Sequence, residues 1–290
     1  MTKALVLGGG GPVGVAWESG LLAGLAENGV DLSSADFTVG TSAGSFVGAQ
    51  LALGRSPAQI AALDLAGAVP APAASGPPPD LTTLITKMVE AASGKRPPEE
   101  VRAEIGAWAL KSPAMSEEDF MLRFAPSLGG VFDGPWPAKS YACTSVDAAD
   151  GSFVVWNKDA EIGLARAVAS SCAVPGIYPP VSFRGRRYID GGMRSATNAD
   201  LAKGYDAVVV VAVMPKTMPS FVSDLFGKRF EDELQALRDS GSRVEVIVPD
   251  EQSAAAFGIN LMDATRRQPS AQAGLTQGRN EAARLLDIWR

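Results

Sequence analysis

The sequence predicts an α/β protein built around a mainly parallel sheet. Its first fifty residues alternate a short apolar run, a glycine turn, a helical segment, a second apolar run and another helical segment. A longer run over 206–213 (DAVVVVAV) is apolar on both faces, which is typical of a central strand in a parallel sheet. Because 46% of the 290 residues are hydrophobic and only 20% are charged, the chain can fill a globular core.

The individual elements follow from apolar spacing and from the glycine and proline residues at their ends. Strands are predicted at 4–7, 37–39, 140–146, 153–156, 187–189, 206–213 and 244–248. Helices are predicted at 15–27, 45–53, 81–89, 101–108, from 116 onward, 162–171 and 271–289. We expect one domain over 1–290, with a Pro/Ala-rich loop and a mainly helical insertion at about 67–130.

Composition excludes several classes of function. A net charge of −6 gives no general attraction for nucleic acid, so no nucleic-acid partner is expected. The chain has only two cysteines, Cys143 and Cys172, which indicates reduced thiols and a cytoplasmic location. It shows neither a signal peptide nor an apolar run of the roughly 20 residues that a membrane span needs. Any membrane contact would therefore be transient and peripheral, and the oligomeric state is left open.

One apolar stripe bears on that membrane contact. Its large apolar residues recur at near-helical spacing among charges, at Phe221, Val222, Leu225, Phe226, Phe230, Leu234 and Leu237. Such a stripe indicates either a helix that lies in a lipid interface or, more commonly, the core-facing side of a surface helix.

Gly40-Thr41-Ser42-Ala43-Gly44 reads as a nucleophile elbow of the G-x-S-x-G type. The predicted strand ends at Val39 and a predicted helix begins at Ser45, so Ser42 would stand on a sharp strand-to-helix turn. The backbone N–H of Ala43 and the positive end of that helix would face an oxyanion. The alternative is a chance turn of small residues.

A glycine run, Gly8 to Gly14, follows the first predicted strand. Its spacing matches the dinucleotide fingerprint, but no acidic residue stands at the end of the second predicted strand to hold a ribose. The same bare N–H groups suit an oxyanion hole. We therefore expect the hole to use Gly9, Gly10 and Gly11 together with Ala43, and we keep a dinucleotide-binding oxidoreductase as the less favoured alternative.

The chain contains no histidine, which excludes a Ser-His-Asp triad. The base for a serine nucleophile must then be aspartate, glutamate, lysine or tyrosine. Asp190 ends a predicted strand and precedes Gly191 and Gly192, which let backbone or substrate approach closely. An ordinary strand-ending turn aspartate is the alternative at this position.

Four separated blocks, GGGGPVG, GTSAG, ASSCAVPGIYPPV and DGG, together resemble the patatin-like phospholipases. The resemblance extends from Ala4 to roughly Leu201. It implies a three-layer α/β/α sandwich and hydrolysis of lipid or other acyl esters by a serine–aspartate dyad, without cofactor or metal. By this match Ser42 is the nucleophile and Asp190 its partner. The glycines that support these motifs are Gly14, Gly40, Gly44, Gly191 and Gly192.

The chain departs from the family pattern at Val13, where an arginine or lysine commonly precedes the last glycine of the run. That loss of charge weakens the expectation of a phospholipid head group more than the expectation of ester hydrolysis. A non-catalytic lipid- or partner-binding protein on the same fold is a further alternative.

Overall fold

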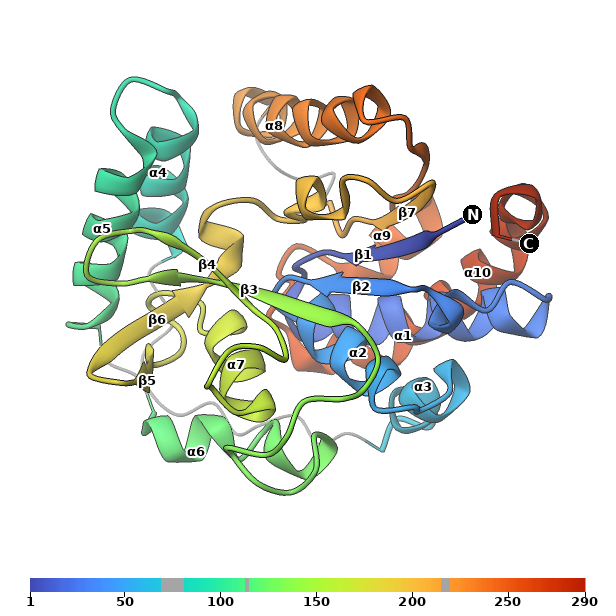
Figure 1. Cartoon of the computed structure of the whole chain (residues 1–290), viewed down its shortest axis with the longest axis horizontal. Coiled ribbons are helices and arrows are strands. Elements are labelled where there is room, and N and C mark those ends of the chain that lie inside the picture. The colour runs from blue at the N-terminus through green and yellow to red at the C-terminus, as the bar shows by residue number, and fades with distance from the viewer. Residues whose placement is uncertain (69–80, 113–114, 215–219, 290) are drawn as a thin grey trace.

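The computed structural model describes residues 1–68, 81–112, 115–214 and 220–289, without the side chains of 81, 92 and 220–226. Within these residues, eight strands form one sheet in the order β5-β6-β3-β2-β1-β7-β8, with β4 paired to β3 (Figure 1). The strands are β1 (Lys3–Leu7), β2 (Phe37–Gly40), β3 (Tyr141–Asp147), β4 (Phe153–Trp156), β5 (Val181–Phe183), β6 (Arg186–Asp190), β7 (Ala207–Val211) and β8 (Arg243–Ile247). The pairs β3–β2, β2–β1, β1–β7 and β7–β8 are parallel, whereas β4, β5 and β6 pair antiparallel.

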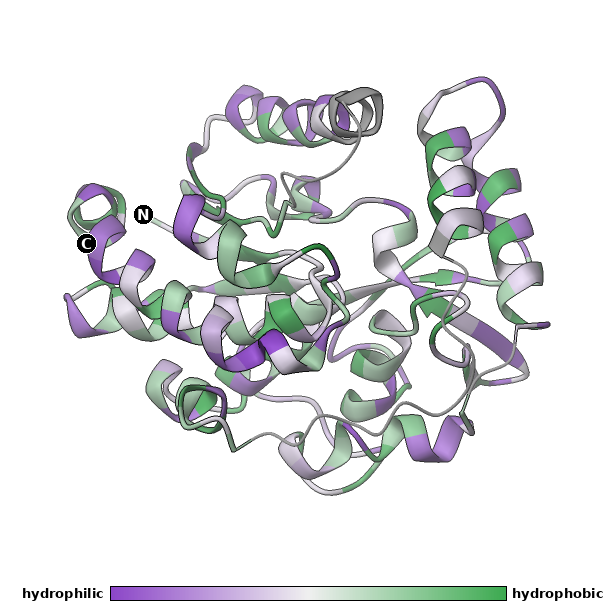
Figure 2. Cartoon of the chain, turned by 180° about the vertical axis from the view of Figure 1, so that it is seen from behind, coloured by the Kyte–Doolittle hydropathy of each residue, from purple (hydrophilic) through white to green (hydrophobic). Residues whose placement is uncertain are grey.

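Helices cover both faces of the sheet (Figures 1 and 2). In β1, Leu5 and Leu7 pack in the core that includes α1 (Gly11–Glu27), α2 (Ala43–Ala52) and α10 (Arg267–Trp289). Ala4 and Val6 pack on the other side, against α8 (Ser220–Asp239) and the 3-10 turn η4 (Ala199–Ala202). This alternation is what a strand covered by helices on both faces requires. The three-layer α/β/α arrangement with a mainly parallel sheet is confirmed.

The register along β3 explains how two distant segments of the chain meet. Gly40 at the end of β2 pairs with Cys143. Asp190 at the end of β6 pairs with Ser145, two residues further along β3. Because β4 pairs along one edge of β3, β2 and β6 lie one after the other along the opposite edge. Ser42 follows Gly40 by two residues, so the chain brings it to the level of Ser145, where Asp190 stands on the same edge.

The described part of the segment expected to be a helical insertion contains three helices, α4 (Leu81–Ala92), α5 (Pro98–Ala109) and α6 (Glu117–Met121). Leu84 and Ile105 pack with Val146 of β3 and Ile189 of β6, so α4 and α5 lie against the antiparallel end of the sheet. Phe120 of α6 packs in a separate core with α7 (Leu164–Ser171). Most of the predicted Pro/Ala-rich loop, 69–80, lies outside the described residues.

Several elements differ from the sequence-based expectations. Helix α1 begins at Gly11 rather than at 15, because Pro12 fits the first turn of a helix and the glycine run leads directly into it. Strand β5 and helices α3 (Pro57–Leu65) and α9 (Glu251–Phe257) were not predicted. Leu234 and Leu237 of α8 are buried in the core, which supports the core-facing interpretation of the apolar stripe for its described part. The stripe side chains at 221–226 lie outside the described residues.

Two searches of the described residues bear on the expected locations and cofactors. No described helix is long and apolar enough to cross a membrane. Over the same residues, histidine, cysteine, aspartate and glutamate side chains form no group of three or more that could hold a metal ion. Cys143 and Cys172 are both free thiols and both buried.

Candidate active site

Ser42 stands at the turn between β2 and α2 with φ 51° and ψ −116°. A non-glycine residue in the left-handed region is strained, and such strain is commonly found at functional sites. The flanking glycines are required by close packing. A Cβ on Gly40 would overlap the carbonyl oxygen of Gly44, and a Cβ on Gly44 would overlap the carbonyl oxygen of Leu7 in β1. The G-x-S-x-G pattern therefore lets α2 start directly against the sheet.

The backbone of Ser42 is held from α7. Its N–H donates to Oγ of Ser171 at 3.0 Å, and its carbonyl oxygen accepts from Sγ of Cys172 at 3.1 Å. The same carbonyl accepts from Oγ of Ser45 at 2.6 Å. Ser171 and Cys172 belong to the ASSCAVPG block of the sequence, whose motif alone predicts no individual role for either residue. The structure assigns these two side chains to holding the strained turn.

Asp190 lies beside Ser42 at the end of β6. The two residues are 2% and 7% exposed, respectively. Burial raises the pKa of the Asp190 carboxyl from 3.8 to about 7, because the charged form loses its hydration. Hydrogen bonds from the Ser42 side chain and from the Gly192 backbone act in the opposite direction on this pKa. The N–H of Gly192 lies 2.7 Å from Oδ1 of Asp190.

The two glycines after Asp190 meet different neighbours. A Cβ on Gly191 would overlap Oγ1 of Thr144 in β3, and a Cβ on Gly192 would lie 2.9 Å from Oδ1 of Asp190. At position 191 only a residue without a side chain fits against the backbone of β3, and at position 192 a side chain would press on the carboxyl itself. The D-G-G pattern therefore keeps the carboxyl close to the sheet.

The glycine turn that follows β1 lies against Ser42. A Cβ on Gly9 would lie 3.3 Å from the Cβ of Ser42. The N–H of Gly9 donates to the carbonyl oxygen of Ala196 at 2.8 Å, so it already has a partner. The N–H groups of Gly10, Gly11 and Ala43 make no hydrogen bond within the described part of the chain. Of the four expected oxyanion donors, three are therefore unengaged in this structure.

Two helix N-termini meet at this turn. A Cβ on Gly14 of α1 would lie 3.4 Å from the Cβ of Ala43, the first residue of α2. Both helices therefore direct their positive ends and free N–H groups toward the same region. Val13, where the sequence resemblance leads one to expect a cation, is wholly buried in the apolar core. This position therefore adds no charge to the turn.

A buried polar cluster beneath the elbow was not predicted from the sequence. Its central residue is Asn198, whose Nδ2 lies 3.0 Å from Oγ1 of Thr41 and 3.3 Å from Oγ1 of Thr144. The two threonine hydroxyls are 3.0 Å apart. These contacts join segments more than fifty residues apart in the sequence, and no short motif marks them. The structure thus adds Asn198 to the surroundings of the candidate dyad.

A cavity of about 570 Å³ lies next to the candidate dyad, between α4, α5, α8 and the loop after β6. Gly192 and Ala196 are in its wall, one beside the Asp190 carboxyl and the other accepting the N–H of Gly9. Met193 and Phe230 give part of the wall an apolar character, and Arg229 of α8 adds a cation. The cavity therefore offers both apolar and charged surface beside the loop that follows Asp190, and neither Ser42 nor Asp190 is among its lining residues.

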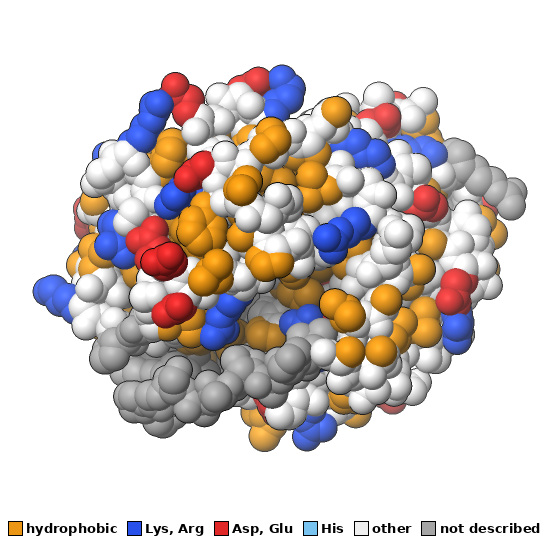
Figure 3. Space-filling view, turned by 90° about the horizontal axis from the view of Figure 1, so that it is seen from below, with side chains coloured by type: hydrophobic (Ala, Val, Ile, Leu, Met, Phe, Trp, Pro, Cys, Tyr) orange, Lys and Arg blue, Asp and Glu red, His pale blue; other side chains and the backbone are white. Residues whose placement is uncertain are grey.

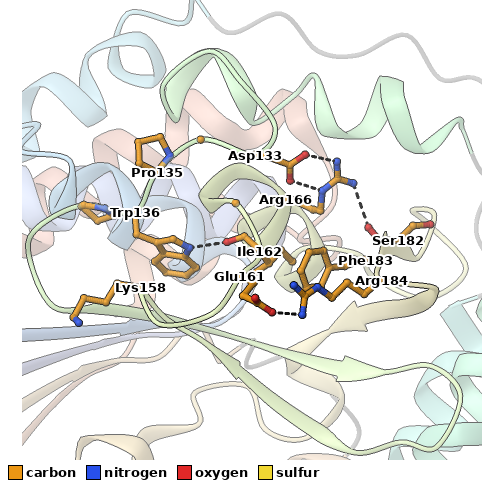
Figure 4. Close-up of a pocket in the computed structure, with 13 residues that line it drawn as sticks. Asp133, Pro135, Trp136, Lys158, Glu161, Ile162, Arg166, Ser182, Phe183 and Arg184 are labelled. Carbon is orange, nitrogen blue, oxygen red and sulfur yellow. Dashed lines mark hydrogen bonds and ion pairs between the residues drawn. The ribbon is translucent and has the colours of Figure 1, made fainter.

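A second cavity, of about 670 Å³, has a different setting (Figure 4). It is lined by residues around the start of α7 and β5, and none of the candidate site residues is among them. Arg166 pairs with Asp133 and Arg184 pairs with Glu161 in its wall, so these charges neutralise one another.

Seen from below, the molecule also has a hollow with apolar side chains gathered around it (Figure 3).

Comparison with known proteins finds a family match for part of the chain. Residues 80–203 match the family model described as patatin-like phospholipase. This segment includes Asp190 and Asn198 but begins after Ser42 and the glycine turn. No curated protein matches the chain.

Similar solved structures include VipD from Legionella pneumophila, with 15% identity, a TM-score of 0.46 and coverage of 99% of this chain and 67% of VipD. The type III effector protein ExoU has 18% identity and a TM-score of 0.41, and the match covers 97% of this chain and 53% of ExoU. The ExoU–SpcU complex from the type III secretion system of Pseudomonas aeruginosa gives 18% identity and a TM-score of 0.33, with coverage of 99% of this chain and 61% of the matched chain. The chain thus spans between about half and two thirds of the length of these proteins. Over residues 80–203, the family match confirms the resemblance to patatin-like phospholipases that the sequence motifs indicate.

Proposed function

We propose that the chain is a lipid acyl hydrolase that cleaves carboxylic esters through Ser42 and Asp190. The observation that carries the proposal is the pairing of a strained, nearly buried serine with a buried carboxyl whose pKa is raised to about 7. An aspartate at its usual pKa would be a weak base, whereas this one is matched to neutral pH. The family match over residues 80–203 supports the same class of reaction.

In the proposed first step, Oγ of Ser42 attacks the ester carbonyl and its proton passes to Asp190. The N–H groups of Gly10, Gly11 and Ala43 then stabilise the oxyanion, a contribution of about 3 kcal/mol per donor. Collapse of the tetrahedral intermediate breaks the bond to the alcohol, which leaves with the proton from Asp190. Water then attacks the acyl-enzyme, Asp190 accepts a proton from it, and the carboxylic acid departs as Ser42 regains its proton.

The cavity beside the loop after β6 supports an amphiphilic ester as the substrate. Its apolar wall suits an acyl chain or a glycerol backbone, and Lys228 suits a polar head, whereas Arg229 is paired with Glu233 in the same wall. The location of Gly192 in its wall would place such an ester next to the Asp190 carboxyl. In this proposal the membrane contact is limited to delivery of a lipid substrate, in an aqueous compartment such as the cytoplasm.

The test is reaction of the purified chain with a fluorophosphonate, followed by intact and peptide mass spectrometry. We expect one adduct, on Ser42, which disappears in Ser42→Ala and forms much more slowly in Asp190→Asn. Ser152→Ala, an exposed serine on the turn between β3 and β4, is the matched control and should react like the wild type. A panel of micellar esters, with and without a phosphate head group, then identifies the preferred substrate.

Two results would contradict the proposal. An unreactive wild type, in the presence of detergent or lipid as well as in their absence, would leave a protein that binds lipid or a partner without turnover. An adduct on another serine would show that Ser42 is not the nucleophile.

A further inference from the structure

Asn198 lies wholly buried between the two turns that carry the candidate dyad. Its Nδ2 contacts Oγ1 of Thr41, the residue before Ser42, at 3.0 Å. The same nitrogen lies 3.3 Å from the carbonyl oxygen of Gly191, the residue after Asp190. One amide group thus touches the immediate neighbour of the candidate nucleophile and the immediate neighbour of the candidate base.

The orientation of the amide is set by its surroundings. Oδ1 of Asn198 accepts from Nη1 of Arg194 at 2.8 Å, and Arg194 is itself held by both carboxylate oxygens of Asp200, at 2.9 and 2.7 Å. Because a guanidinium only donates, the amide oxygen must face it and the NH₂ group must face Thr41 and Gly191. The carbonyl oxygen of Ser195 also lies 2.9 Å from Nδ2, so the two amide hydrogens are shared among Ser195, Thr41 and Gly191.

The backbone of Asn198 is fixed as well. It adopts a left-handed conformation with φ 50°, which asparagine tolerates better than most residues. On either side of it, Glu233 of α8 accepts from Oγ1 of Thr197 at 2.8 Å and from the N–H of Ala199 at 3.0 Å. Helix α8 therefore anchors the segment that presents the amide to the dyad.

We propose that Asn198 is a positioning residue, which sets the distance between Ser42 and Asp190 by holding Thr41 and Gly191 together. The role rests on the proposed function, because it matters only if a proton passes between the two side chains. Proton transfer requires heavy atoms about 2.6–3.2 Å apart, and a displacement of about 1 Å can cost on the order of a hundredfold in rate. Asn198 itself touches neither the substrate nor the reacting atoms in this scheme.

Two substitutions distinguish the effect of the Asn198 amide group from the effect of its left-handed backbone conformation. Asn198→Gly keeps the positive φ and removes the amide, and Asn198→Asp keeps the shape and removes the NH₂ donor. Arg184→Gly is the matched control. Arg184 also adopts a positive φ, 49°, but it is exposed and its side chain pairs with Glu161 away from the dyad. All four proteins are compared by melting temperature, by the rate of Ser42 labelling with a fluorophosphonate, and by kcat and KM on one ester.

We expect both Asn198 variants to remain folded, to label Ser42 about tenfold or more slowly, and to lose kcat with little change in KM. Arg184→Gly should label at the wild-type rate. The inference is overturned if either folded Asn198 variant labels at the wild-type rate, or if the lost activity equals the fraction of unfolded protein. A wild type that never labels would overturn the proposed function, and this role of Asn198 with it.

Discussion

The backbone N–H of Gly192 donates to Oδ1 of Asp190 at 2.7 Å, while the rest of that carboxyl is surrounded by protein. This single charge-stabilising contact, together with the side-chain hydrogen bond from Ser42, does not offset the loss of water. The pKa of Asp190 therefore remains raised, at about 7. A carboxyl in this state changes its charge within the neutral pH range, and this has two measurable consequences.

The first consequence is a pH-dependent reactivity of Ser42. Only the ionised Asp190 can accept the serine proton, so the labelling rate should rise about tenfold per pH unit well below 7 and level off above it. The measurement is the second-order rate constant for fluorophosphonate labelling between pH 5 and about pH 9, with rates corrected for probe hydrolysis. A profile that is flat through pH 7, or that rises only near pH 4, would contradict the role of a buried base.

The second consequence concerns stability. The pKa of Asp190 in the folded protein lies above its ordinary value of 3.8. The contribution of Asp190 to the free energy of unfolding is therefore present at low pH and is lost as the pH rises through about 7. Asp190→Asn keeps the shape and cannot ionise. We expect this variant to be more stable than the wild type above pH 7, by on the order of 4 kcal/mol, and to lose this advantage below pH 4. Urea unfolding at pH 4, 6 and 8 measures the difference.

Local sequence patterns were sufficient for the elements that bear the candidate dyad. Gly40 and Gly44 are dictated by contacts within one strand–turn–helix unit, so the motif around Ser42 can be read directly. Helix α3 also carries a local signal, since Ser56 and Gln59 form a capping box, although this helix was not among those predicted. Strand β5 has three residues, too few for a periodicity to appear, and among the described strands its partner is β6.

The contacts that the sequence did not reveal are those between distant segments. Gly9 was expected to donate to an oxyanion, but its N–H meets the carbonyl oxygen of Ala196, nearly two hundred residues away in the chain. Asn198 reaches Thr41 and Thr144 in the same way. Such pairings depend on the strand order β3-β2-β1-β7 and on the register along β3. A local sequence pattern determines neither the strand order nor the register.

A third prediction concerns Ser171, whose Oγ accepts the N–H of Ser42 at 3.0 Å. Ser171→Ala leaves that buried N–H without its partner, which should cost about 1–3 kcal/mol and let the strained turn relax. We expect a lower free energy of unfolding together with slower labelling of Ser42. Cys172→Ala is the matched comparison, because the carbonyl of Ser42 keeps its hydrogen bond from Ser45 when the Cys172 contact is lost. We therefore expect Cys172→Ala to slow the labelling of Ser42 less than Ser171→Ala does. Equal effects of the two substitutions would argue against a special role for Ser171.

The fourth prediction tests whether the elbow needs its glycines for packing. A Cβ on Gly44 would overlap the backbone of Leu7, which cannot move without displacing β1. We expect Gly44→Ala to destabilise the protein by about 3 kcal/mol or more. Gly227→Ala is the matched control, since Gly227 lies inside α8 and a Cβ added there would meet no described atom within 4 Å. There alanine should add about 0.5–1 kcal/mol through its higher helix propensity. Thermal and urea unfolding of both variants measure whether stability falls in Gly44→Ala and rises in Gly227→Ala. A Gly44→Ala protein as stable as the wild type would show that β1 and α2 do not pack as closely as described.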